Sequence, residues 1–194
     1  ITAILIIVFS YVLSGNLGNY IAGFWKWEFG KQTFEMISTF LSGVLIIIIG
    51  LLVYKHIIMA LSAPFMSPVS EKIEEHLTGI KDQHIKTSFQ QQLLRSIKVN
   101  VRNLIKEIVI TIPILLLSFI PVIGIFFTFL LFIVQAYYAG FGNMDYTLER
   151  YFSYKESIKF VQKNKGVAIG NGIVFILFLL IPVIGVILVL PLSV

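Results

Sequence analysis

Long apolar stretches without charge alternate with shorter charged stretches along this chain. Residues 34–54 carry one charged side chain, Glu35, while residues 108–144 and 167–194 carry none. A bilayer core of about 30 Å is crossed by about 20 helical residues, so residues 34–54 are predicted to form a transmembrane helix. The whole pattern predicts an all-α integral membrane protein with a single membrane domain.

The first apolar stretch, residues 1–13, is followed by the polar residues 14–19. We expect this stretch to be the end of a longer transmembrane helix and the polar residues to be its exit from the bilayer. Trp25 and Trp27 then alternate with charged residues, and tryptophan favours the lipid headgroup level, which predicts an interfacial loop. Both chain ends lie inside apolar runs, so the sequence is expected to be truncated at both ends.

The sequence Ile-Pro-Val-Ile-Gly occurs twice, at 120–124 and at 181–185, each time inside an apolar run. Proline cannot continue a helix, and glycine permits the positive φ of a tight turn. Pro121 and Gly124 are therefore predicted to form the turn of one helical hairpin, and Pro182 and Gly185 the turn of a second.

The arms of these hairpins look short for a membrane crossing. Residues 108–119 give the first arm only about 18 Å at the helical rise. We therefore expect two hemi-penetrating hairpins, which enter the membrane partway and return to the same side. Two full crossings would leave the flanking loops on the same face equally well, so arm length alone separates these interpretations.

A helix-break motif containing Pro64, Phe65 and Pro68 follows the predicted transmembrane helix. Ser67 is a suitable N-cap and Pro68 a suitable first helical residue. The motif predicts that a new helix starts here and leaves the membrane near Thr78.

Residues 85–108 have the pattern of an amphipathic helix. At 100° per residue an apolar face is separated from a basic face, and the basic face holds Arg95, Lys98, Arg102 and Lys106. Such a helix lies on a membrane surface or packs under a helix bundle. The functional alternative is that the basic face lines an access route for anions.

The polar residues 145–166 are predicted to connect the two hairpins, with Ser153 and Glu156 forming the capping box of a short helix. The predicted parts of the domain are residues 1–64 with two transmembrane helices and the Trp-rich loop, 65–106 with amphipathic cytoplasmic helices, 107–144 with hairpin one, 145–166 with the connector, and 167–194 with the incomplete hairpin two.

Composition strengthens the membrane assignment, since 57% of residues are hydrophobic and only 13% are charged, against about 25% charged in soluble domains. The net charge of +5 comes with a strong asymmetry: thirteen of the 15 Lys and Arg residues are Lys55 or lie in 72–106 and 150–165. Positive residues stay on the cytoplasmic side, so these loops are predicted to be cytoplasmic, beside anionic lipid rather than nucleic acid.

The residues that carry enzyme chemistry are not arranged for it. There is no cysteine and therefore no disulfide or thiol chemistry, and the three histidines lack metal-ligand spacing. No nucleotide-binding or nucleophile motif is present, so we expect neither catalysis nor a cofactor. Gly140-Phe141-Gly142 and Gly170-Asn171-Gly172 are interpreted as sites of close helix packing rather than as phosphate cradles.

The order of motifs resembles the bacterial CysZ-type sulfate permeases, a superfamily shared with etoposide-induced membrane proteins of the eukaryotic endoplasmic reticulum. The matching motifs are Ala63-Pro64-Phe65, Pro68 to Glu74, Ile120 to Gly124, Asp145-Tyr146 ahead of Arg150, Ser153 with Lys155-Glu156, Lys163 to Gly166, and Ile181-Pro182. The resemblance implies two long transmembrane helices, two hemi-penetrating hairpins and a homo-oligomer. It also implies sulfate uptake across the bacterial inner membrane for cysteine synthesis.

Two departures limit what the resemblance assigns. The family's sulfate-binding Gly-x-Arg motif is absent from this chain, and Thr147 stands where the family commonly has proline after Asp-Tyr. The remaining candidates for an anion pathway are Arg102 and Arg150, since guanidinium groups suit oxyanions. Asp145 is expected either to orient Arg150 or to form a structural pair.

No acidic residue lies within the uncharged hairpin segments, which argues against a carboxylate proton relay there. The two hypotheses from the sequence are a channel or permease for sulfate or another small anion, and a membrane-shaping or scaffold protein that does not transport.

Overall fold

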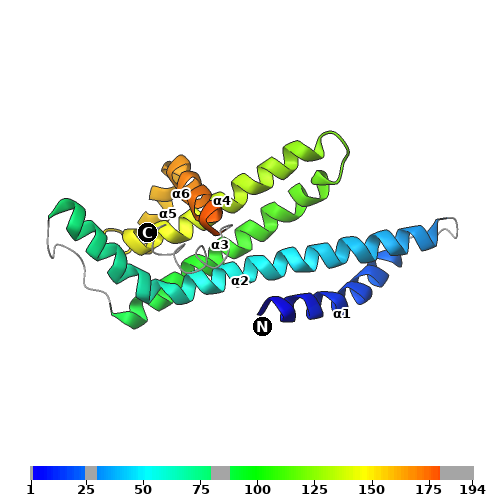
Figure 1. Cartoon of the computed structure of the whole chain (residues 1–194), viewed down its shortest axis with the longest axis horizontal. Helices are drawn as coiled ribbons and strands as arrows, with labels where there is room; N and C mark the ends of the chain where they lie inside the picture. The colour runs from blue at the N-terminus through cyan, green and yellow to red at the C-terminus, as the bar shows by residue number, and fades with distance from the viewer. Residues whose placement is uncertain (1, 25–29, 80–87, 180–194) are drawn as a thin grey trace. The chain divides into compact units, whose positions relative to one another are not determined.

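The computed structural model describes residues 2–24, 30–79 and 88–179. Within these ranges the chain is all-helical, as predicted, and strands are absent. The described residues form the helices α1 (Thr2–Ala22), α2 (Lys31–Thr78), α3 (Phe89–Ser118), α4 (Gly124–Leu148), α5 (Tyr154–Lys163) and α6 (Lys165–Leu179) (Figure 1). Helices α2 and α4 are long and apolar enough to cross a membrane.

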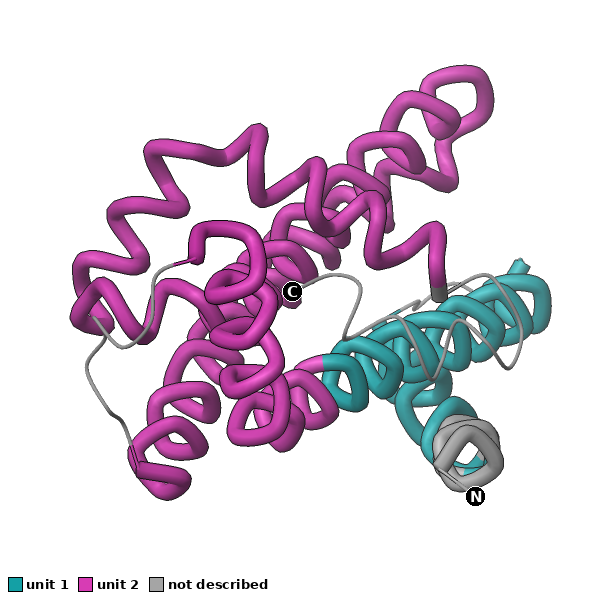
Figure 2. Tube along the Cα trace, turned by 60° about the vertical axis from the view of Figure 1, so that its left-hand side comes forward, with its two compact units in different colours: residues 1–55 teal, residues 56–194 magenta. Residues whose placement is uncertain are grey.

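The chain divides into two compact units, residues 1–55 and 56–194, and α2 contributes to both (Figure 2). In the first unit α1 packs on α2 through small residues. A Cβ on Gly18 would lie 2.5 Å from the Thr39 hydroxyl, and one on Gly43 would lie 3.5 Å from Ser14 Cβ. The Ser38 hydroxyl donates a hydrogen bond to the Gly18 carbonyl at 3.1 Å.

Helix α1 continues through residues 14–19, and Ser14 and Gly18 of this segment lie at the contact with α2. That these residues form the exit from the bilayer stays a prediction. The predicted Trp-rich loop lies outside the described residues.

Helix α2 contains the predicted transmembrane stretch but continues through Pro64 and Pro68, so the predicted new start at Ser67 is wrong. Each proline removes one backbone hydrogen bond. Carbonyls near them receive donors from other side chains: Tyr146 Oη donates to the Met59 carbonyl at 2.9 Å, and Arg150 Nη1 donates to the Ser67 carbonyl at 3.2 Å. These bonds connect this part of α2 to residues 146–150, but they do not replace the bonds that the prolines remove, which would reach the carbonyls of Ala60 and Pro64.

Helices α3 and α4 form a hairpin whose turn, residues 119–123, contains Pro121 (Figure 1). The positive φ of the turn falls on Val122, at 72°, and not on Gly124. Gly124 is needed for a different reason, since a Cβ there would overlap the Ser118 carbonyl oxygen. The turn predicted at Pro182 and Gly185 lies outside the described residues.

The arms of this hairpin are longer than the uncharged segments suggested. Helix α3 has 30 residues and α4 has 25, which correspond to about 45 Å and 37 Å at the helical rise. The short-arm premise therefore does not hold for either helix, and hemi-penetration stays a prediction.

The capping box at Ser153 and Glu156 is confirmed at the start of α5. Asp145 lies in α4 and is buried, so the helix extends four residues into the predicted connector.

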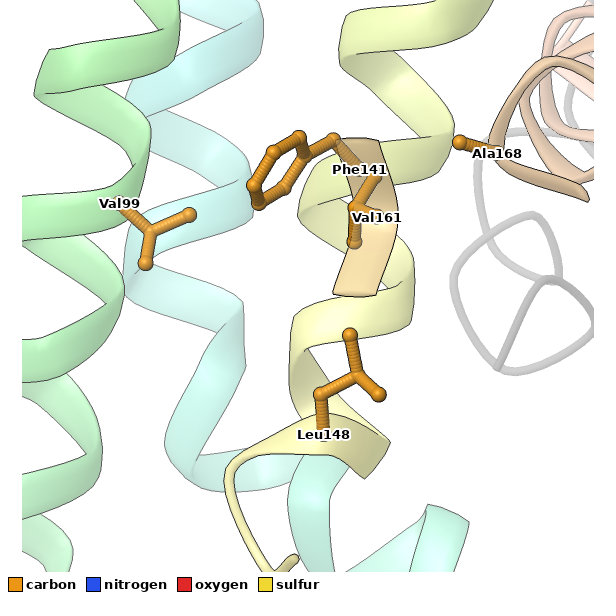
Figure 3. Packing of buried hydrophobic residues seen from close by; sticks show 5 residues of the cluster. All are labelled: Val99, Phe141, Leu148, Val161 and Ala168. Carbon is orange, nitrogen blue, oxygen red and sulfur yellow. The ribbon is translucent and has the colours of Figure 1, made fainter. Parts of the chain in front are cut away.

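Helix α4 packs against α3 and α6. The crossing with α6 is very close, because a Cβ on Gly140 would overlap the Ala168 carbonyl and one on Gly172 would overlap the Ala136 carbonyl. The predicted packing role is confirmed for Gly140 and Gly172, but not for Gly170, where nothing lies within 4 Å of an added Cβ. Around them lies a hydrophobic core in which Phe141 of α4 points toward Val99 of α3 (Figure 3). The whole core cluster is Val99, Phe141, Leu148, Val161 and Ala168.

Helix α3 buries a set of polar residues and exposes many of its apolar residues. Its buried residues are Ser96, Val99, Asn100, Asn103, Glu107, Thr111 and Leu115. Leu94, Val101, Ile105 and Val109 are at least half exposed on the surface. An inverted arrangement of this kind suits a helix with lipid outside and a polar interior.

Candidate functional site

A groove of about 530 Å³ lies in the second unit, between α3, α4 and the helices that follow them. Three of its lining residues are cations, Arg102 and Lys106 from α3 and Lys165 from α6. The other lining residues are Ile110, Ile133, Val134, Tyr137, Tyr138, Gln162 and Ile169. None of these described lining residues is acidic, so the groove presents a positive potential together with amide and hydroxyl donors. We call it the basic groove.

Arg102 is held in the basic groove by two contacts. Its guanidinium carbon lies 5.4 Å from the centre of the Phe141 ring, and Nη1 donates a 2.8 Å hydrogen bond to Oδ1 of Asn103. Stacking on an aromatic ring orients the guanidinium plane. A guanidinium has five N–H donors, and the bond to Asn103 uses one of them. This geometry is suited to an oxyanion that binds from the groove.

Arg150 was the other arginine predicted for an anion pathway, and the structure places it in a different setting. It is 5% exposed. Nη1 donates to the carbonyls of Ser67 and Tyr146, and Nη2 donates to Ser70 Oγ at 3.0 Å and Glu74 Oε2 at 2.8 Å. These bonds link the end of α4 to the last turns of α2. We call this arrangement the Arg150 anchor.

Asp145 does not orient Arg150, as one expectation had it, but is bound by Arg95 of α3. Nη2 of Arg95 lies 3.1 Å from Oδ1, and Nε lies 3.4 Å from Oδ2. Arg95 also donates to the Phe152 carbonyl and the Ser157 hydroxyl. The pair therefore joins α3, α4 and the start of α5, which is the structural role considered as the alternative.

Glu149 lies one residue beyond α4, beside the Arg150 anchor, and is 4% exposed. Burial, with a smaller contribution from the Asp145 carboxylate, raises the pKa of Glu149 from its ordinary value to about 7. The Ser67 hydroxyl, Arg95 and Arg150 lower this pKa but do not offset the burial. Close to neutral pH this carboxyl is therefore partly protonated.

A buried polar cluster links α2 to α3. His56 Nδ1 lies 3.0 Å from Asn100 Oδ1, and His56 Nε2 lies 2.7 Å from Glu107 Oε2. All three side chains are 2% exposed or less. Asn100 Nδ2 in turn donates to the Ser96 carbonyl at 3.0 Å.

The sequence interpretation missed this cluster. It considered the histidines only as metal ligands, and it counted the uncharged segment from residue 108, one residue after Glu107. A helical projection contains the missing signal, because Asn103, Glu107, Ser96, Asn100 and Thr111 fall between about 280° and 360° from Leu93. This is a third face of α3, separate from the apolar and the basic faces.

Comparison with known proteins adds one match. A sequence model of the family described as sulfate transporter CysZ/etoposide-induced protein 2.4 matches residues 1–190. No curated protein and no solved structure matches the chain.

Proposed function

The chain belongs to the sulfate transporter CysZ/etoposide-induced protein 2.4 family, and from this premise we propose that it conducts sulfate or a similar small oxyanion across a membrane. The observation that carries the proposal is the basic groove, in which Arg102, Lys106 and Lys165 face one cavity of about 530 Å³. An Arg guanidinium matches the geometry of tetrahedral oxyanions, and two lysines add charge.

The basic groove also has features that favour passage over trapping. Lys106 is exposed, and a cation in contact with water binds an anion weakly because its charge is screened. A conduction site must attract the ion and still release it. A partly open groove with one oriented arginine meets both needs better than a closed site would.

We propose the bacterial inner membrane as the location, with several crossings and the basic segments in the cytoplasm. The supporting observation is the clustering of Lys and Arg in the segments 72–106 and 150–165. In this proposal the sulfate supplies cysteine synthesis, and the protein works as a homo-oligomer, as expected from the resemblance.

A second candidate is a membrane-shaping or scaffold protein without transport, since the matched family description also covers etoposide-induced protein 2.4. The apolar outer face of α3 favours insertion into a bilayer in either case. Only the basic groove separates the two functions, because a scaffold has no use for an oriented anion site.

Uptake of radiolabelled sulfate into proteoliposomes that contain the full-length protein tests the proposal. We compare wild type, Arg102→Gln and, as a matched control, Lys98→Gln. Lys98 lies one turn earlier on α3, outside the groove, with Nζ 4.8 Å from the Tyr154 ring centre. A hydrogen bond to a charged group contributes about 1.5–3 kcal/mol, so Arg102→Gln should slow uptake about tenfold or more, while Lys98→Gln transports as wild type.

Unlabelled sulfate should compete with the labelled ion, and chloride should not. Absence of uptake by wild-type protein that is folded and inserted would contradict the proposal and favour the scaffold. Equal loss in both variants would show that the groove is not the site.

A further inference from the structure

Three buried polar residues of α3 follow one another at four-residue spacing: Asn103, Glu107 and Thr111. Their exposed fractions are 0%, 0% and 2%. Residues four apart lie on one face of a helix, so these side chains form a continuous line, which we call the inner polar stripe. Over eight residues it covers about 12 Å of the helix axis.

Two members of the inner polar stripe keep polar atoms without a partner. Asn103 Nδ2 and Thr111 Oγ1 are buried and form no hydrogen bond with any of the described residues. Arg102 Nη1 donates a hydrogen bond to Oδ1 of Asn103, which identifies this atom as the amide oxygen. The unpaired atom of the Asn103 amide is therefore the nitrogen Nδ2, which is a donor. Each buried polar atom that stays unpaired costs about 1–3 kcal/mol. Water or a polar ligand would remove this cost.

The inner polar stripe runs beside the basic groove for its whole length. Asn103 follows Arg102, Glu107 follows Lys106 and Thr111 follows Ile110, and each of these preceding residues lines the groove. The hydrogen bond from Arg102 to Asn103 joins the two surfaces directly. An anion bound at Arg102 therefore lies next to the first unpaired donor of the stripe.

Glu107 stands between the two unpaired donors. Its Oε2 lies 2.7 Å from His56 Nε2, so this oxygen already has a partner in the protein. Donor sites separated by a group that is engaged with the protein hold an anion less tightly than a continuous set of donors, and conduction requires a path without a deep trap.

We propose that the inner polar stripe is hydrated and that the transported oxyanion passes along it, from Arg102 to the donors of Asn103 and Thr111. This inference rests on the proposed transport function and adds the residues that line the path. It also explains why α3 keeps its polar face inward, where a dry interior would favour apolar side chains.

Cysteine accessibility suits this test because residues 1–194 contain no cysteine, and labelling of the unsubstituted full-length protein gives the background. Asn103→Cys and Thr111→Cys introduce thiols on the stripe, and Val101→Cys and Val109→Cys introduce matched thiols on the outer face of the same helix. Lys159→Cys on the exposed surface of α5 is the positive control. Each variant of the full-length protein is reconstituted and treated with anionic and cationic methanethiosulfonate reagents.

The thiolate is the reactive form, and an apolar environment raises the thiol pKa, with each unit lowering the thiolate fraction about tenfold. We therefore expect positions 103 and 111 to react about tenfold faster or more than positions 101 and 109. The anionic reagent should be faster than the cationic one, and sulfate should slow labelling of positions 103 and 111 but not of position 159.

Labelling at 103 and 111 that is no faster than at 101 and 109, in protein whose wild-type form takes up sulfate, would overturn the hydrated path and leave the transport function standing. Fast labelling without any effect of sulfate would overturn the role of the stripe in carrying the anion. Failure of sulfate uptake in wild type is a separate result, which contradicts the proposed function itself.

A second pair of variants covers the case in which a cysteine disturbs folding. Thr111→Val keeps the side-chain shape and removes only the hydroxyl, while Thr111→Ser keeps the hydroxyl. The proposal expects uptake to fall several-fold in Thr111→Val and to stay near wild type in Thr111→Ser. Equal uptake by both variants would contradict it.

Discussion

The basic groove and the Arg150 anchor each contain one arginine that the sequence marked as an anion residue, yet their surroundings differ. Arg150 donates to two carbonyls, a hydroxyl and a carboxylate that belong to the protein itself. Arg102 stacks on Phe141, donates to Asn103 and lines a cavity beside two lysines.

The comparison shows how burial and partners decide the role of a charged side chain. A buried guanidinium whose two Nη groups are engaged by neighbouring elements holds those elements together and has little to offer a ligand. A guanidinium that is held by an aromatic ring and by a single hydrogen bond keeps its orientation, and it can still bind a ligand from the open side. The following predictions test this division, beginning with the largest expected effect.

Replacement of Arg150 by Met should lower stability more than any other change considered. It leaves Glu74 and the Ser67 carbonyl without this partner. Removal of one member of a fully buried ion pair costs about 3–5 kcal/mol, and because the Glu74 side chain is 25% exposed the expected loss is at or below the lower end of this range. Thermal unfolding of the detergent-solubilised protein measures the effect, with exposed Lys159→Met as the control. Unchanged stability would show that the anchor is not structural.

Gly172→Ala should deform the groove without changing its charge. The added Cβ would overlap the Ala136 carbonyl and push α6 away from α4, and overpacking of this kind costs up to about 3 kcal/mol. Tyr137 and Tyr138 of α4 and Lys165 of α6 line the groove, so sulfate binding should weaken as well.

Gly170→Ala is the matched control, because nothing lies within 4 Å of a Cβ at that position. It should be neutral or slightly stabilising, since alanine favours helix over glycine by about 0.5–1 kcal/mol. Similar effects of both substitutions on melting temperature and sulfate affinity would disprove the role of the close crossing.

Stability should depend on pH through Glu149, at the edge of the anchor. Its pKa is raised to about 7 in the folded protein, so folding favours the protonated form. The stability that depends on protonation of Glu149 is fully present below the pKa of about 4.3 in the unfolded chain, and it is lost as pH rises to about 7. This loss in the free energy of unfolding is about 1–2 kcal/mol after solvent screening.

Melting temperatures of wild type and Glu149→Gln between pH 4.5 and 8 measure this contribution. The advantage of the Gln variant should grow as pH rises and then level off above pH 7. A constant difference across this range would mean that Glu149 has the same pKa in the folded and unfolded protein.

The smallest expected effect is that of Lys106→Gln, which removes one exposed charge from the groove. The Coulomb energy between two charges 4 Å apart in water is about 1 kcal/mol, so sulfate affinity should fall about fivefold or less. The effect should shrink at high salt because exposed charges are screened. If Lys106→Gln lowered sulfate affinity as much as Arg102→Gln, Arg102 would contribute no more to sulfate binding than Lys106 does.

Several features of the fold could be predicted from the sequence because they depend on local chemistry. The stretch at residues 34–54 is helical within α2, the capping box starts α5, and Gly140 and Gly172 lie at a close crossing. Local signals failed where tertiary contacts outweighed them. Pro64 and Pro68 do not break α2, and this part of the helix also accepts hydrogen bonds from Tyr146 and Arg150, which are distant in the sequence.

The candidate site was only partly visible in the sequence. Arg102 was selected for its chemistry and lies in the groove, but the same reasoning selected Arg150, whose partners come from residues about 80 positions away. The buried face of α3 escaped notice because the projection was divided into apolar and basic residues. Its neutral polar side chains, together with Glu107, belonged to neither group.

Equilibrium binding of radiolabelled sulfate to the purified full-length protein tests the central claim most directly. The account predicts saturable binding by wild type and by Lys98→Gln, and affinity lowered about tenfold or more in Arg102→Gln, since a charge-assisted hydrogen bond contributes about 1.5–3 kcal/mol. Arg102→Gln that binds sulfate as tightly as wild type would contradict the assignment of the basic groove as the anion site.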